Sequence, residues 1–169
     1  MRFLIIFIFL LSNSFAEEVP DIKNIVINKE LKKYDSLTFL DAKKNQIKLD
    51  DYGGKLILLN FWATWCAPCK EEMPSLDMLQ TNVNLNNLKI FPINVGQDNI
   101  EKAEIFFKDL KINNLNPYFD SSITLAKKFG LRGIPTSILF NKKGEEFARV
   151  IGSIDFNDEK FIEWLSKYN

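Results

Sequence analysis

The only two cysteines of the sequence, Cys66 and Cys69, are separated by two residues. A pair at this spacing can alternate between a dithiol and a disulfide, and its thiolate can attack the disulfides of other molecules. Thiol-disulfide exchange is therefore the first chemistry to consider. A purely structural disulfide is the main alternative, but its loop would be very short and would remove little entropy from the unfolded chain.

The sequence contains no histidine, and this absence excludes several other uses of the cysteine pair. A structural zinc site needs four ligands, usually including a second cysteine or histidine pair, which this sequence lacks. A covalent haem site requires histidine directly after the second cysteine, but residue 70 is lysine. Because no nicotinamide, flavin or metal motif is found either, we expect no cofactor and no metal.

The two residues between the cysteines, Ala67 and Pro68, indicate the direction of exchange. If a helix begins here, its free N–H groups and dipole favour the Cys66 thiolate by about 0.3–2 kcal/mol. That can lower a thiol pKa from about 8.5 toward 7, but not to about 3.5, the value of the strongest oxidants. We therefore expect a reductase or isomerase nearer about −270 mV than −120 mV, rather than a primary disulfide oxidase.

The cysteine pair lies at a predicted junction between a strand and a helix. Residues 55–62 form a nearly continuous apolar run, which is typical of a central strand covered on both faces. After the pair, apolar residues recur at helical spacing, although Pro74 should bend this helix. The predicted apolar face consists of Met73, Leu76, Leu79 and Val83.

The other predicted elements alternate between strands and helices. A strand at 88–95 contains Pro92, which cannot donate to a ladder, so we expect a bulge or an unpaired edge there. This alternation predicts an α/β fold with a central mixed sheet flanked by helices. The remaining elements are a hairpin at 36–49, helices near 100–110, 121–129 and 155–168, and a closing hairpin of 137–140 with 145–151.

Residues 1–16 at the N-terminus have the pattern that is typical of an export signal. Arg2 supplies a positive start, residues 3–11 are apolar, and residues 14–16 place small side chains near a cleavage site before Glu17. We therefore expect a protein of the periplasm or another extracytoplasmic space. The alternative is an uncleaved leader that tethers the protein to the membrane.

Length and charge set further limits on the chain. Its 169 residues are 46% hydrophobic and include fifteen phenylalanines, enough for a core without disulfide staples. Basic and acidic residues number 22 each, so nothing suggests binding to nucleic acid or to an anionic membrane. We expect an arm or linker over residues 17–35, a single domain over 36–169, and a monomer.

Two segments of the sequence resemble a known family. Residues 61–74, Phe-Trp-Ala-Thr-Trp-Cys-Ala-Pro-Cys-Lys-Glu-Glu-Met-Pro, resemble the active-site segment of the TlpA-like (ResA-like) thioredoxins. Residues 133–136, Gly-Ile-Pro-Thr, resemble the cis-proline loop of the same superfamily. The resemblance extends from about Leu37 to the C-terminus. It implies a thioredoxin fold with an N-terminal β-hairpin and a thiol-disulfide oxidoreductase with Cys66 as nucleophile and Cys69 as resolving cysteine.

The resemblance also implies a surface for the substrate polypeptide. It implies that the Ile134-Pro135 bond is cis, that it faces the cysteines, and that the backbone before the proline pairs with an extended substrate. An ordinary trans-proline turn is the alternative. Ile134, Pro135, Thr136 and Trp65 are therefore candidates for substrate binding. Simple packing remains an alternative for Trp65 and Thr136.

A third implication concerns proton transfer. Asn60 stands where ordinary thioredoxin has a buried acid, and it cannot carry a proton. Glu72, one helical turn after Cys69, matches the acid that TlpA-like reductases hold beneath the motif. We hypothesise that Glu72 is partly buried, has a raised pKa and manages the proton of Cys69. The alternative is a solvated helix residue like Glu71.

The family resemblance suggests partners but does not select among them. Its members act on disulfides or thiols of target proteins, often apocytochrome c during maturation, and a membrane thiol-disulfide transporter re-reduces them. A disulfide oxidase or isomerase stays an alternative, as does a redox-inert binding or chaperone module that uses the apolar rim around Trp65 and Ile134. A peroxiredoxin-like peroxidase is less favoured, because it would carry Thr or Ser where this chain has Ala63.

Overall fold

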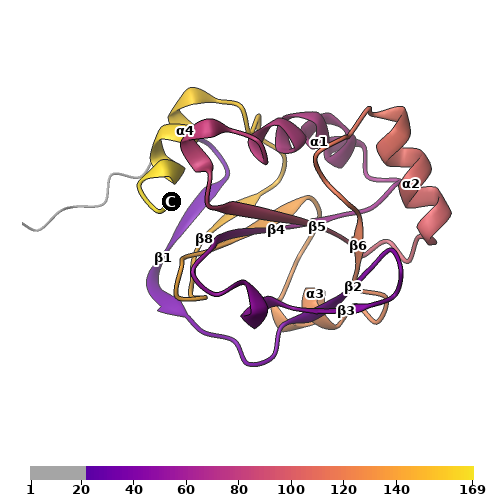
Figure 1. Cartoon of the computed structure of the whole chain (residues 1–169), viewed down its shortest axis with the longest axis horizontal. Coiled ribbons are helices and arrows are strands. Elements are labelled where there is room, and N and C mark those ends of the chain that lie inside the picture. Colours follow the sequence, from indigo (N-terminus) through magenta and orange to yellow (C-terminus); the bar gives the residue numbers. More distant parts are fainter. Residues whose placement is uncertain (1–21) are drawn as a thin grey trace, which may run out of the picture.

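The structure, a computed structural model, describes residues 22–169. The predicted signal segment 1–16 and residues 17–21 of the predicted arm lie outside the described residues. The described part forms a mixed eight-stranded sheet in the order β1-β8-β7-β4-β5-β6-β2-β3, with helices on both faces (Figure 1). This confirms the predicted α/β architecture.

The elements follow one another along the chain in the predicted alternation. The strands are β1 Ile25–Lys32, β2 Thr38–Asp41, β3 Gln46–Lys48, β4 Leu56–Trp62, β5 Leu88–Asn94, β6 Tyr118–Phe119, β7 Thr136–Phe140 and β8 Glu146–Ile151. The helices are α1 Ala67–Leu79, α2 Ile100–Asp109, α3 Thr124–Lys128 and α4 Glu159–Ser166. Two 3-10 turns lie at Leu49–Tyr52 and Val83–Leu85.

Strand β4 is the centre of the sheet, and each of its seven residues is buried. It pairs in parallel with β5 and antiparallel with β7. Because side chains alternate along a strand, Leu56, Leu58 and Trp62 contribute to one apolar cluster, whereas Ile57, Leu59 and Phe61 contribute to the other. Helices α1, α2 and α4 cover the first cluster, and α3 and the β2–β3 hairpin cover the second (Figure 1).

The expectation of a linker at residues 17–35 is corrected where the structure describes it. Residues 25–32 form β1, which pairs antiparallel with β8 and so extends the sheet by an edge strand. Ile25 and Ile27 pack against the core, whereas most of the later residues are exposed. The apolar signal is only three residues long, and the pairing partner lies at the far end of the chain, so local sequence could not reveal the strand.

Of the two alternatives predicted at Pro92, a bulge or an unpaired edge, the structure shows the unpaired edge. The register of β4 and β5 runs without a bulge through the pair Asn60 and Pro92. Val95 donates its N–H to Trp62 of β4, so alternation turns the Pro92 nitrogen toward the β6 side. There β6 pairs only with Ile93 and Asn94, and the missing donor therefore lies beyond the end of the β6 ladder.

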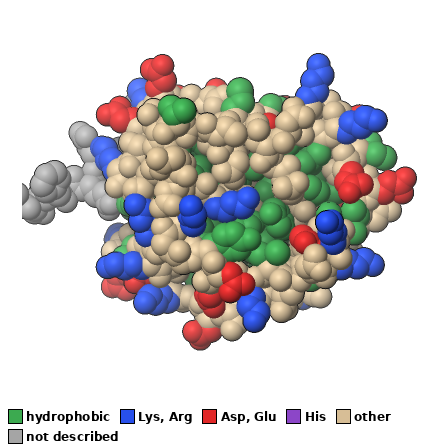
Figure 2. All heavy atoms as spheres, in the orientation of Figure 1, with side chains coloured by type: hydrophobic (Ala, Val, Ile, Leu, Met, Phe, Trp, Pro, Cys, Tyr) green, Lys and Arg blue, Asp and Glu red, His purple; other side chains and the backbone are tan. Residues whose placement is uncertain are grey.

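Two smaller differences concern helix α1 and the surface. The helix continues through Pro74 but ends at Leu79, so Val83, predicted on its apolar face, lies in a separate turn and is 86% exposed. On the face shown in Figure 2, basic and acidic side chains are interspersed around a central apolar area. Among residues 22–169, no helix is long and apolar enough to cross a membrane.

Candidate functional site

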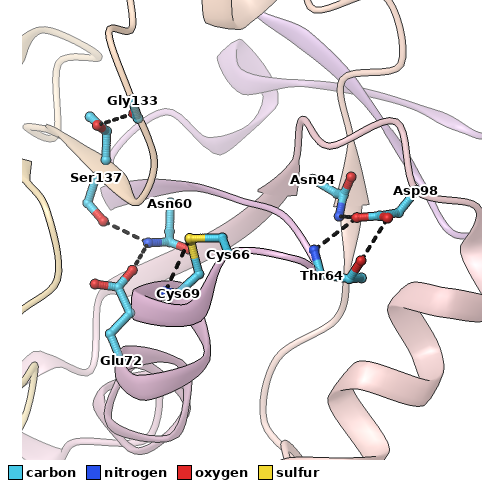
Figure 3. Close-up of a disulfide and its surroundings, with 10 residues drawn as sticks. Asn60, Thr64, Cys66, Cys69, Glu72, Asn94, Asp98, Gly133 and Ser137 are labelled. Atoms are coloured by element: carbon cyan, nitrogen blue, oxygen red, sulfur yellow. Dashed lines mark hydrogen bonds between the residues drawn. A yellow bond between two sulfur atoms is a disulfide. The ribbon is translucent and has the colours of Figure 1, made fainter.

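Cys66 and Cys69 form a disulfide at the N-terminus of α1 (Figure 3). Cys66 is the N-cap residue, and its Sγ accepts a hydrogen bond from the Cys69 backbone N–H at 3.3 Å. Pro68 lies in the first turn, where a helix N–H has no intrahelical partner to lose. In the reduced protein, the same backbone N–H and the positive end of the helix dipole favour a thiolate on Cys66.

The two sulfur-bearing residues differ in their access to solvent. Cys69 is fully buried, whereas Cys66 retains 4% exposure and follows Trp65, which is 69% exposed. An incoming disulfide therefore meets the Cys66 side of the pair first. The roles of Cys66 as the attacking cysteine and Cys69 as the resolving cysteine stay predictions.

The loop before β7 contains the predicted cis bond, between Ile134 and Pro135. Antiparallel pairing of Phe61 with Thr136 places this loop alongside the end of β4, from which the chain runs on to Cys66. Ile134 packs against both apolar clusters of the core, one of which contains the two cysteines. The structure thus brings the predicted cis-proline loop and the cysteine segment together at the C-terminal end of β4.

The side chain of Thr136 is directed into its own loop. It is buried, and its hydroxyl donates a hydrogen bond to the Gly133 carbonyl at 2.9 Å. Trp65, in contrast, lies on the surface. Of the predicted substrate residues, Trp65 therefore presents its side chain to solvent, while Thr136 shapes the loop.

Glu72 is buried beneath the cysteine pair, with 2% of its surface exposed. Its Oε1 accepts a hydrogen bond from Asn60 Nδ2 at 2.7 Å, and the same amide nitrogen donates to Ser137 Oγ at 3.0 Å (Figure 3). Glu72 lies one helical turn after Cys69 on α1, as the sequence predicts. The side chain is not the solvated glutamate of the alternative interpretation.

Burial raises the pKa of Glu72 to about 8, because a carboxylate loses its hydration in this site. The hydrogen bond from Asn60 acts in the opposite direction but is the smaller effect. In this oxidised protein, with the Cys66–Cys69 disulfide formed, the carboxyl is therefore mostly protonated at neutral pH. A carboxyl group with this pKa can exchange a proton with a thiol, whose ordinary pKa is about 8.5.

A second network, which the sequence analysis missed, holds the loop before Cys66. Asp98 accepts hydrogen bonds from the Thr64 N–H at 2.9 Å, from the Thr64 hydroxyl at 2.7 Å and from Asn94 Nδ2 at 2.9 Å. Burial acts to raise the pKa of Asp98, but these hydrogen bonds outweigh it and hold the pKa below its ordinary value. One feature of the sequence could have indicated this network. Asp98 comes shortly after the predicted strand at 88–95, just as Cys66 comes shortly after the predicted strand at 55–62.

Gly96 lets the loop after β5 approach the cysteine segment closely. A Cβ at this position would lie 2.5 Å from the Ala63 Cβ, closer than real Cβ atoms approach other atoms, and 3.0 Å from Trp65 Nε1, tighter than most real contacts. The backbone of Gly96 is also fixed, since its N–H donates to Asn94 Oδ1 at 3.0 Å. The exposed Trp65 therefore lies against this glycine.

The described part of the chain offers no metal site at the cysteines or elsewhere. No group of three or more Cys, His, Asp or Glu side chains within residues 22–169 is arranged to hold a metal ion.

Comparison with known proteins gives consistent matches. The model of the AhpC/TSA family matches residues 22–145. Thiol-disulfide oxidoreductase ResA from Geobacillus thermodenitrificans is 32% identical over 123 residues, which cover 71% of this chain and 68% of that protein. ResA from Bacillus subtilis is 30% identical over 114 residues, which cover 68% and 63%.

Solved structures match over most of the described chain. StoA from Bacillus subtilis is 29% identical, with a TM-score of 0.63 over 76% of this chain and 95% of that one. A secreted thiol-disulfide isomerase from Corynebacterium glutamicum is 21% identical, with a TM-score of 0.70 over 88% and 95%. At that identity the second match is evidence of a shared fold only.

Proposed function

Because the chain belongs to the AhpC/TSA family, and is a ResA-like thiol-disulfide oxidoreductase with a thioredoxin-like fold, we propose that it reduces disulfides of target proteins outside the cytoplasm. The observation that carries this proposal is the Cys66–Cys69 disulfide at the start of α1, with Cys66 as the N-cap. That position stabilises the thiolate which must attack the target.

The proposed cycle starts from the reduced dithiol. The Cys66 thiolate attacks one sulfur of the target disulfide, which forms a mixed disulfide and releases the other target sulfur as a thiolate. Cys69 loses its proton and attacks Cys66 Sγ, which releases the second target sulfur and forms the Cys66–Cys69 disulfide. Two electrons pass to the target, and an external dithiol, proposed to be that of a membrane thiol-disulfide transporter, restores the protein.

Glu72 is the proposed acceptor of the Cys69 proton. Cys69 is fully buried and cannot pass its proton directly to bulk water, and Glu72 follows it by one helical turn. The pKa of about 8 places the carboxyl close to an ordinary thiol in proton affinity. In the oxidised protein the carboxyl then holds the proton that the next reduction returns to Cys69.

The proposed substrate surface consists of Trp65 and the loop Ile134, Pro135 and Thr136. An extended target segment can pair with the backbone at Ile134, in the manner of an added strand. Trp65, next to Cys66, offers an exposed aromatic surface at the same end of β4 as this loop. Thr136 supports the loop through its hydrogen bond to Gly133.

The direction of exchange and the target are also proposals. Ala67 and Pro68 place no cation between the cysteines, which favours a reducing couple over a strong oxidant. The resemblance of residues 61–74 to the TlpA-like thioredoxins supports apocytochrome c, during its maturation, as the proposed target. An export signal at residues 1–16 would place the protein in the periplasm or an equivalent extracytoplasmic space.

A reduction assay and a redox titration test this function. With dithiothreitol as electron donor, the wild-type protein should accelerate the reduction of insulin disulfides, and Cys66→Ser should give no rate above background. The reduction potential should lie nearer about −270 mV than −120 mV. A potential above about −150 mV would overturn the reductase assignment, and insulin reduction by Cys66→Ser equal to wild type would overturn the exchange mechanism.

A further inference from the structure

Three buried polar side chains from three separate elements meet beneath the disulfide. Asn60 of β4 is fully buried, and Glu72 of α1 and Ser137 of β7 are each 2% exposed. The Asn60 amide nitrogen donates one hydrogen bond to the Glu72 carboxyl at 2.7 Å and the other to the Ser137 hydroxyl at 3.0 Å (Figure 3). Both amide hydrogens of Asn60 are therefore used.

The two acceptors fix the orientation of the Asn60 amide. Its Oδ1 is buried without a hydrogen-bond partner among the described residues, so the oxygen side contributes nothing to the choice of orientation. The orientation of the amide is therefore set by its nitrogen, which donates to the Glu72 carboxyl and to the Ser137 hydroxyl. Asn60 and Ser137 are also direct cross-strand partners in β4 and β7, which keeps them at hydrogen-bonding distance.

We propose that Ser137 is a positioning residue for proton transfer: its hydroxyl holds the Asn60 amide, and this amide holds the Glu72 carboxyl where it serves Cys69. The inference rests on the proposed role of Glu72. Ser137 follows Thr136 and the cis bond at Pro135, so two hydrogen bonds through the Asn60 amide link the start of β7 to the proton acceptor.

The surroundings of Glu72 make this link measurable, because no charged side chain acts on its carboxyl in the oxidised protein. The carboxyl is influenced by burial, by the Asn60 amide and by the Ile154 backbone. Strand β4 presents Asn60 to the carboxyl, and β7 presents Ser137 to Asn60. Helix α1 and its N-cap contribute the two cysteines as titratable groups. In the reduced protein, an inflection that disappears in Glu72→Gln can therefore be assigned to Glu72.

The test is the pH dependence of disulfide reduction by the full-length reduced protein, measured with a small aromatic disulfide. Ser137→Ala should move the Glu72 inflection upward by about half a pH unit or more, because the carboxylate loses a well-placed donor. Ser137→Thr keeps a hydroxyl and should retain the wild-type profile. If Ser137→Ala does not fold, Ser137→Gly removes the same hydroxyl and should give the same shift.

Ser75→Ala is the matched control. The Ser75 hydroxyl is also buried on α1 and donates to the backbone carbonyl of Glu72 at 2.8 Å, but it does not touch the carboxyl. Its loss should lower stability and leave the inflection in place. A similar shift in Ser75→Ala and Ser137→Ala would overturn the inference, as would a similar shift in Ser137→Thr.

The remaining outcomes separate this inference from the proposed function. If Glu72→Gln removes the inflection but Ser137→Ala leaves it unmoved, Ser137 has no positioning role and the role of Glu72 stands. If Glu72→Gln itself leaves the profile unchanged, the proposed role of Glu72 is wrong, and the inference about Ser137 is overturned with it.

Discussion

Asp98 accepts two hydrogen bonds from Thr64, one from the backbone N–H at 2.9 Å and one from the hydroxyl at 2.7 Å. Thr64 lies two residues before Cys66, and Asp98 lies in the loop between β5 and α2. This paired contact ties the segment that carries the nucleophile to the neighbouring parallel strand. It shows that the geometry of the site depends on residues outside the cysteine motif.

Replacing Asp98 with alanine should loosen this segment. The Thr64 N–H and hydroxyl and the Asn94 amide lose a charged acceptor, which should lower the free energy of unfolding by about 2 kcal/mol. The rate of disulfide reduction should fall as well, because Cys66 is held less firmly. Urea titration and the insulin assay measure the two effects. Glu101→Ala, which removes an exposed acid from the first turn of α2, is the control, and equal losses in both variants would argue against the tether.

Replacing Gly96 with alanine should disturb the site through sterics alone. The new Cβ would lie 2.5 Å from the Ala63 Cβ, so the segment before Cys66 must shift. We expect reduced exchange activity and changed fluorescence of Trp65, which also lies against this glycine. Gly53→Ala is the control, since its Cβ would make only an ordinary contact at 3.7 Å. An active Gly96→Ala variant with unchanged fluorescence would show that the close approach is unimportant.

The buried Glu72 predicts an unusual dependence of stability on pH. Its pKa is raised from 4.5 to about 8 on folding, so the oxidised native state binds more protons than the unfolded state between these values. Its contribution to stability is thus fully present below about pH 4.5 and is lost as pH rises toward 8, by roughly 1.4 kcal/mol per pH unit. Denaturant titrations of wild type and Glu72→Gln should differ in this slope. Identical slopes would mean that Glu72 does not hold its proton in the fold.

A buried ion pair should anchor the edge strand β1. Fully buried Glu146 accepts hydrogen bonds from Arg149 Nε at 2.8 Å, from Tyr34 at 2.6 Å and from Asn28 at 2.8 Å. Arg149→Ala would leave the carboxylate without its cation and should cost about 3–5 kcal/mol. Hydrogen exchange of residues 25–32 should then accelerate more than that of β4. Uniform acceleration in both strands would argue that β1 is not anchored here.

The same ion pair gives a pH dependence of the opposite sign to that of Glu72. Burial acts to raise the pKa of Glu146, but hydrogen bonds from Arg149, Tyr34 and Asn28 outweigh it and lower the pKa. The stability that the ionised carboxylate contributes is therefore present above its unfolded pKa and is lost as pH falls through the lowered folded value. Acid titration of Glu146→Gln should lack this loss. If the variant loses stability on acidification as wild type does, other carboxylates are responsible.

Local patterns were sufficient to predict the central elements of the site. The apolar run of β4 followed by a helical repeat placed the cysteines at a strand–helix junction, whereas the position of Glu72 beneath them was expected from the family resemblance. The β2–β3 and β7–β8 hairpins were also predicted, because their strands are neighbours in sequence. These features depend on periodicities of two or 3.6 residues within short segments.

Long-range contacts account for what the sequence did not reveal. The pairing of β1 with β8 joins opposite ends of the domain, and the contact of Asp98 with Thr64 spans a helix and a strand. Ser137 gave no signal because a serine in a buried strand has no distinctive pattern, and its role depends on the side chain opposite it in β4. In each case the partner is defined by tertiary packing, which a local pattern does not contain.

The central claim is that Cys66 attacks the target and that Cys69 completes the exchange. The most direct measurement is trapping of mixed disulfides after exposure of reduced Cys69→Ala and Cys66→Ala to insulin, analysed on non-reducing gels and by mass spectrometry. Cys69→Ala should accumulate an adduct linked through Cys66, and Cys66→Ala should accumulate little, because Cys69 is fully buried. Equal adducts in both variants, or an adduct only through Cys69, would contradict the account.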